Sequence, residues 1–92
     1  MFDLKKIRSD FPILSKKRNN KNFVYFDNAA TTQKPKVVID SISDFYCNYN
    51  GNIQRGIHFL GEEATSRLEG ARHIVSGFLR APSSEEIIFN SS

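Results

Sequence analysis

The balance between helix and strand patterns most constrains what this chain can fold into. Two stretches, Val37–Asn50 and the segment that follows Gly61, carry apolar residues at helical spacing over several turns. Only Phe23–Phe26 and Ile87–Phe89 have the aromatic and β-branched character of strands. Two short strands do not make a stable sheet, yet broad apolar helix faces need a sheet to cover them. The pattern therefore predicts an α/β fold of which these residues are an incomplete piece.

The remaining elements follow from local signals. A first helix is predicted over Asp3–Phe11, because its first residue can cap it and Pro12 ends it. A polar, basic loop is expected to continue to Asn22. Gly51 is placed to end the second helix in a left-handed conformation, and a loop over Asn52–Gly61 precedes the third. The predicted apolar faces are Val38, Ile42, Phe45 and Tyr49 in the second helix and Ala64, Leu68, Ala71, Val75 and Phe78 in the third.

Charge is unevenly distributed along the chain. Residues 1–36 carry nine basic and three acidic side chains, a net charge of +6, whereas residues 37–92 carry four basic and seven acidic ones, a net charge of −3. The densest basic cluster, Lys16, Lys17, Arg18 and Lys21, has no interleaved aromatic residue for base stacking and offers few phosphate contacts. A solvated loop is therefore favoured over a nucleic-acid interface.

No segment reads as a membrane or secretion signal. The chain has no run of about 18 apolar residues, which a membrane-spanning helix needs. Lys5, Lys6 and Arg8 interrupt any apolar stretch near Met1, unlike in a signal peptide. We therefore expect no membrane association and a cytoplasmic location, with an organelle protein that lacks its targeting segment as the alternative.

The few sulfur and imidazole groups exclude two classes of site. A single cysteine, Cys47, forms no internal disulfide, and Cys47, His58 and His73 lack the paired spacing of a structural zinc site. Cys47 shares a predicted helix face with Asp40 and Asp44, and nearby acids disfavour a thiolate. We interpret Cys47 as structural.

Four motifs in order resemble one enzyme family. They are Ile7–Leu14 (IRSDFPIL), Tyr25–Pro35 (YFDNAATTQKP), Asn48–His58 (NYNGNIQRGIH) and Ser83–Phe89 (SSEEIIF). Together they resemble the N-terminal part of class V aminotransferases, which are pyridoxal-phosphate-dependent fold type I enzymes, and especially the SufS-like cysteine desulfurases. Selenocysteine lyases and cysteine sulfinate desulfinases share these features and remain alternatives.

The resemblance implies a homodimeric enzyme that supplies sulfur for iron–sulfur cluster assembly. In that family a lysine holds pyridoxal phosphate as a Schiff base. A cysteine thiolate takes sulfur from L-cysteine as a persulfide, and L-alanine is released. The persulfide sulfur then passes to an acceptor protein. Neither that lysine nor that cysteine has a counterpart here. Residues 1–92 are therefore expected to form an N-terminal segment without a complete domain, inactive and without cofactor when alone. The alternative is a non-catalytic interaction protein derived from the enzyme.

The resemblance also implies which residues border a substrate pocket in the full-length enzyme. Ala29 and Ala30 lie in the loop that borders the pocket, and Arg55, Gly56 and His58 lie in the segment that lines its entrance near the dimer partner. Loop architecture is the alternative explanation, with Asp27 and Asn28 closing an Asx-type turn and Arg55 paired with a carboxylate. This sequence departs from the family at three positions, which are Gln54 for a histidine, Gly51 for an alanine and Gly61 for a capping serine.

Overall fold

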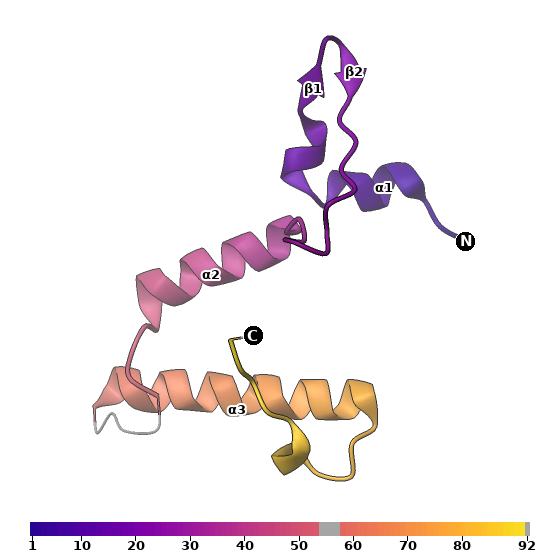
Figure 1. Ribbon diagram of the computed structural model, residues 1–92. Coiled ribbons are helices and arrows are strands. Elements are labelled where there is room, and N and C mark those ends of the chain that lie inside the picture. Colours follow the sequence, from indigo (N-terminus) through magenta and orange to yellow (C-terminus); the bar gives the residue numbers. More distant parts are fainter. Residues whose placement is uncertain (54–57, 92) are drawn as a thin grey trace. The chain divides into compact units, whose positions relative to one another are not determined.

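The computed structural model describes residues 1–53 and 58–91, which are mainly helical (Figure 1). The chain divides into two compact units, Met1–Phe45 and Tyr46–Ser92. Among the described residues no helix is long and apolar enough to cross a membrane. The elements are the helices α1 (Leu4–Ser9), α2 (Lys36–Asn48) and α3 (Phe59–Leu79), the 3-10 turns η1 (Pro12–Ser15) and η2 (Ser84–Glu86), and the strands β1 (Lys17–Arg18) and β2 (Lys21–Asn22).

The first unit begins as the sequence predicts and then departs from the prediction. Asp3 caps α1, with its Oδ1 accepting a hydrogen bond from the Lys6 amide at 3.2 Å. The predicted basic loop is instead an antiparallel hairpin, in which β1 pairs with β2. Asn19 and Asn20 both adopt left-handed backbone angles, with φ of 52° and 61°. Two such residues form the tight turn that joins paired strands, and asparagine tolerates it better than most residues.

The two predicted strands are not strands in the structure. Phe23–Phe26 and Ile87–Phe89 have no strand neighbour among the described residues, and a strand needs one for its main-chain hydrogen bonds. An arginine side chain takes the place of that neighbour in each case. Arg8 donates from Nη2 to the Phe23 carbonyl at 3.1 Å, and Arg72 donates from Nη1 to the Ile87 carbonyl.

The start of α3 differs from the prediction because a different residue caps it. His58, not Gly61, is the N-cap, and its Nδ1 accepts a hydrogen bond from the Gly61 amide at 3.1 Å. Gly61 lies inside the helix and is buried. The ring nitrogen satisfies one of the free amides of the first turn, as a serine oxygen would.

Gly51 has a different role from the predicted one. No described glycine has a positive φ, so Gly51 does not end α2 in a left-handed conformation. Its backbone passes so close to the first turn of α3 that an added Cβ would lie 2.6 Å from the Leu60 carbonyl carbon and oxygen. Gly51 therefore allows a close approach of two backbone segments.

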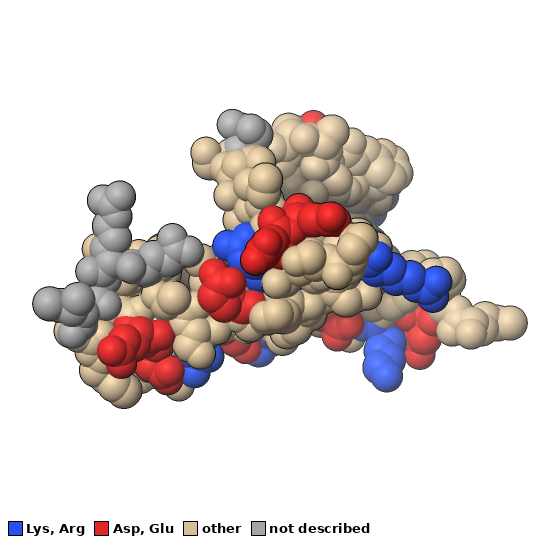
Figure 2. Space-filling model, turned by 90° about the horizontal axis from the view of Figure 1, so that it is seen from below, with Lys and Arg blue, Asp and Glu red and all other residues tan. Residues whose placement is uncertain are grey.

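Much of the predicted apolar surface remains exposed. Ala64 is buried on α3, whereas Phe78 on the same predicted face is 86% exposed and Ile42 on α2 is 52% exposed. The chain exposes 8293 Å² in total, while two separate compact domains of half its mass would expose about 6,500 Å² together. On the face drawn in Figure 2, acidic and basic side chains are interspersed among uncharged ones. The expectation that the helix faces need cover stays a prediction.

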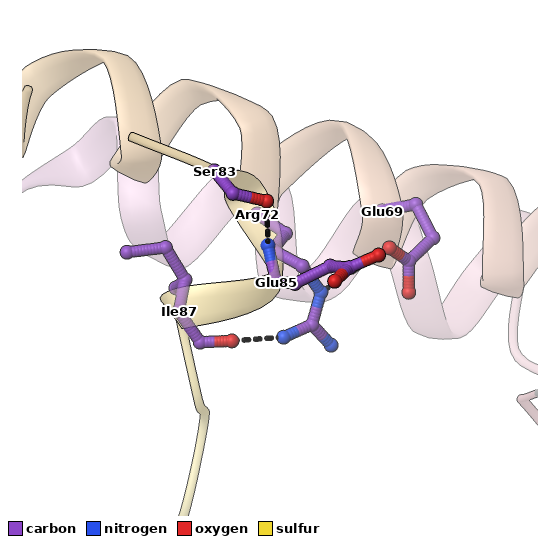
Figure 3. A network of polar contacts seen from close by, with 5 residues as sticks. All are labelled: Glu69, Arg72, Ser83, Glu85 and Ile87. Atoms are coloured by element: carbon purple, nitrogen blue, oxygen red, sulfur yellow. Dashed lines mark hydrogen bonds and ion pairs between the residues drawn. The ribbon is translucent and has the colours of Figure 1, made fainter. Parts of the chain in front are cut away.

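Arg72 organises the second unit (Figure 3). Its side chain is 19% exposed and forms an ion pair with Glu69, Nε to Oε2, at 3.2 Å. Besides its bond to the Ile87 carbonyl, its guanidinium lies 5.2 Å from the centre of the Phe89 ring. Ser83 caps η2 by accepting from the Glu85 amide at 3.2 Å, and Ile87 is buried. The chain after α3 is thus held along the helix by one arginine.

Two glycine substitutions are expected to act in opposite directions. In Gly51→Ala the new methyl group meets backbone that cannot rotate away, so the contact with α3 is lost at a cost of about 1–3 kcal/mol. In Gly70→Ala the methyl group meets nothing within 4 Å inside a helix, so helix formation gains about 1 kcal/mol. Far-ultraviolet circular dichroism of the two variants should show less helix for the first and more for the second. Equal helix content would contradict the close approach at Gly51.

The bond from Arg72 should control how tightly the segment after α3 is held. Arg72→Met leaves the Ile87 carbonyl without its donor, which costs about 1–3 kcal/mol. Amide hydrogen exchange in Ser84–Phe89 should therefore accelerate about tenfold or more. Arg80→Met is the matched control, because it removes the same charge from an exposed position at the C-cap of α3. The same acceleration in both variants would show that charge, rather than the Ile87 bond, holds the segment.

Candidate functional site

The loop that follows Tyr25 is closed by main-chain carbonyls. The Tyr25 hydroxyl lies 3.0 Å from the Asp27 carbonyl oxygen and 2.5 Å from that of Thr31, so its proton is shared between the two. The Asp27 carbonyl also accepts from the amides of Ala30 and Thr31, at 3.1 and 3.3 Å. The loop therefore has a defined shape that depends on Tyr25 and Asp27.

Polar side chains fix the second half of the same loop. The Asn28 Oδ1 accepts from the Gln33 amide at 3.4 Å, and the Thr32 hydroxyl donates to the Asn28 carbonyl at 3.2 Å. Lys34 Nζ donates to the Thr32 carbonyl at 2.6 Å. The predicted Asx-type turn is wrong in detail, because Asp27 closes the turn through its main chain and Asn28 reaches five residues ahead.

Ala29 and Ala30, the residues expected at the pocket border, lie at the exposed tip of this loop. Their methyl groups leave the surrounding backbone accessible, which is what a close approach to a ligand requires. The structure brings them together with Asn28 in one turn. Their contact with a substrate stays a prediction.

An apolar pocket that the sequence did not predict lies beside the loop. It has a volume of about 360 Å³, and Phe11, Tyr25 and Phe26 contribute aromatic surface to it. Asn28 and Thr32 provide polar groups at its wall. The helical pattern of the first residues marks Phe11 as apolar but gives no sign that α1, η1 and the loop enclose a space together.

The residues expected at the pocket entrance are only partly described. Arg55 and Gly56 lie outside the described residues, as does Gln54. His58 is exposed, and its Nδ1 is engaged in capping α3. Nearby, the guanidinium of Arg67 stacks on the Tyr49 ring at 3.5 Å from its centre, which joins the chain after α2 to α3.

The described residues do not fit a pyridoxal phosphate site. All seven lysines are exposed, and Lys34 and Lys36 are already bonded to Thr32 and Asp40 respectively. A lysine that holds a cofactor as a Schiff base lies in a pocket that excludes water, and none of these exposed side chains is enclosed in that way. Across residues 1–53 and 58–91 there is also no group of three side chains able to hold a metal ion.

Beyond the segment that Arg72 holds, the described chain extends to Ser91. Arg72 holds Ile87, and Asn90 and Ser91 follow three and four residues later. Ser91 is exposed and offers one hydroxyl, which alone does not form a phosphate cradle. Cys47 is exposed on α2, in the turn after Asp44.

Comparison with known proteins identifies the chain's relatives. The family model described as aminotransferase class V matches residues 24–92. A probable cysteine desulfurase of Streptomyces coelicolor is 48% identical over 100% of this chain and 22% of its own length. One from Mycolicibacterium paratuberculosis is 54% identical over 97% of this chain and 13% of its own length.

A solved structure shares the fold. The apo structure of a cysteine desulfurase from Thermococcus onnurineus NA1 matches 96% of this chain and 20% of its own, with a TM-score of 0.77 and 35% identity. The chain thus spans about a fifth or less of the length of these relatives. The expected fold class is confirmed, since a piece of this pyridoxal-phosphate-dependent fold covers nearly all described residues. With its motifs, its family match over residues 24–92 and its fold in agreement, the chain belongs to the class V aminotransferase family.

Proposed function

We propose that this chain is part of a SufS-like cysteine desulfurase that supplies sulfur for iron–sulfur cluster assembly. The complete enzyme takes sulfur from L-cysteine as a persulfide and releases L-alanine. It acts in the cytoplasm as a homodimer and delivers its sulfur to an acceptor protein. Pyridoxal phosphate, on which the family generally depends, supplies the electron sink of the reaction.

The observation that carries the proposal is that relatives named as cysteine desulfurases match this chain over nearly its whole length. Relatives named cysteine desulfurase or probable cysteine desulfurase are 48–54% identical over 96–100% of these residues. The self-bonded loop from Tyr25 to Lys34 supports it, because a pocket border needs a fixed backbone. In this proposal Ala29 and Ala30 border the substrate pocket, and Arg55, Gly56 and His58 line its entrance.

These residues alone are proposed to be inactive. Every lysine is exposed, and Cys47 lies on an exposed helix surface rather than on a loop beside a base. Nucleophilic catalysis needs a group activated by a neighbour, and no described cysteine or lysine has that arrangement. In the complete enzyme, residues 1–92 serve as part of the framework and of the pocket border.

Activity measurements on two proteins test the proposal. Native protein, captured from its source cells with antibodies raised against the Met1–Ser92 chain, should release L-alanine from L-cysteine when pyridoxal phosphate is supplied. The recombinant 92-residue chain should release none above a control without protein. Intact mass of the captured protein shows which length carries the activity.

Each alternative gives a different result. If the captured protein releases alanine from selenocysteine or cysteine sulfinate but not from L-cysteine, the enzyme is a selenocysteine lyase or a cysteine sulfinate desulfinase instead. Turnover by the 92-residue chain would overturn its proposed inactivity. A captured protein of 10.5 kDa without any turnover would favour the non-catalytic interaction protein.

A further inference from the structure

The hairpin in the first unit is a strongly charged surface of one sign. Between Phe11 and Phe26 the chain contains no aspartate or glutamate. Every basic side chain of this stretch is exposed, and within the part of the chain that the structure describes none of them forms an ion pair. These side chains are Lys16, Lys17, Arg18 and Lys21. The hairpin therefore presents exposed cations that form no ion pair among residues 1–53 and 58–91.

The pairing of the strands places two of these cations directly opposite each other. Arg18 pairs with Lys21 and Lys17 pairs with Asn22. Because paired residues point to the same face of a ladder, Arg18 and Lys21 share one face. Like charges in this position destabilise a hairpin. The left-handed Asn19 and Asn20 fix this register, since a two-residue loop of this type allows no slip.

Nothing else within the hairpin offsets that repulsion. Both strands are two residues long and fully exposed, and neither contains an apolar side chain. A pair of strands of this size is not stable through its own packing. An anion bound between Arg18 and Lys21 would convert the repulsion into two favourable contacts. The arginine fork binds a carboxylate through two parallel hydrogen bonds, and the lysine adds a point charge.

We propose that the hairpin over Lys16–Asn22 is a docking site for an acidic segment of a protein partner. Aspartate and glutamate side chains of the partner bind across the Arg18–Lys21 face, while Lys16 and Lys17 attract the segment from a distance. A nucleic acid fits the hairpin less well. There is no aromatic residue within Lys16–Asn22 for base stacking, and two-residue strands are too short to follow a groove.

Binding of deca-glutamate to the full chain tests this site. Fluorescence anisotropy of the labelled peptide should show saturable binding that weakens as salt is raised. Arg18→Gln combined with Lys21→Gln should weaken binding about tenfold, as expected for the loss of two exposed ion pairs. Lys5→Gln combined with Lys6→Gln is the matched control, because it removes the same charge from α1, and it should change binding less than about twofold.

A second pair of variants separates hairpin geometry from charge. Asn20→Val disfavours the left-handed turn without changing any charge and should weaken binding, whereas Asn20→Gly keeps the turn and should preserve it. Equal losses in the hairpin and α1 variants, or unchanged binding in Asn20→Val, would reduce the effect to net charge and overturn the proposal. Tighter binding of decathymidylate than of deca-glutamate would overturn it in favour of nucleic acid.

Discussion

Two hydrogen bonds from arginine side chains to main-chain carbonyls, one in each unit, join segments that are 15 residues apart in the sequence. Arg8 binds the carbonyl of Phe23 in the first unit, and Arg72 binds that of Ile87 in the second. Arg8 lies in α1 and Arg72 lies in α3, and each fixes a segment without regular structure against its own helix. Bonds of this kind, with a charged donor, contribute about 1.5–3 kcal/mol each, which is large where few side chains are buried.

Most of the other polar contacts are local, apart from the hydrogen bond that the Lys36 amide donates to the Asp10 carbonyl at 2.7 Å, and few side chains are buried. The loop after Tyr25 satisfies its own carbonyls and amides, so it keeps its shape without outside partners. In contrast, apolar side chains of α2 and α3 such as Val37 and Ile74 are 70% and 75% exposed. Full-length relatives, of which this chain matches 13–22%, have additional chain with which such faces can be covered. The loop fixes its own shape, whereas apolar side chains of the helices remain available for further contacts.

Helices could be predicted from the sequence because their signals are local. Asp3 and Pro12 fix the ends of the first helix, and the apolar spacing from Val38 to Tyr49 marks the second. The strand predictions were wrong because a strand forms only beside a second strand. The composition of Phe23–Phe26 does not reveal whether such a neighbour is present. The cap at His58 was missed since an imidazole acceptor is not among the usual capping groups.

The site could be predicted less completely than the fold. The family motif drew attention to the loop with Ala29 and Ala30, but not to the Tyr25 bonds that shape it. The Arg18–Lys21 pairing escaped prediction for another reason. A cluster of cations looks the same in a solvated loop and in a hairpin, and only the backbone angles of Asn19 and Asn20 distinguish them.

The short sequence separation of the two arginine bonds affects how the chain folds. Each bond joins residues that are 15 positions apart, so the entropy lost in closing either loop is small. Contacts between residues so close in sequence form quickly and do not wait for distant parts of the chain. Both can therefore form early in folding, before contacts between distant parts of the chain. The apolar helix faces have no such local partner, and in this period they are the surfaces that a chaperone would meet first.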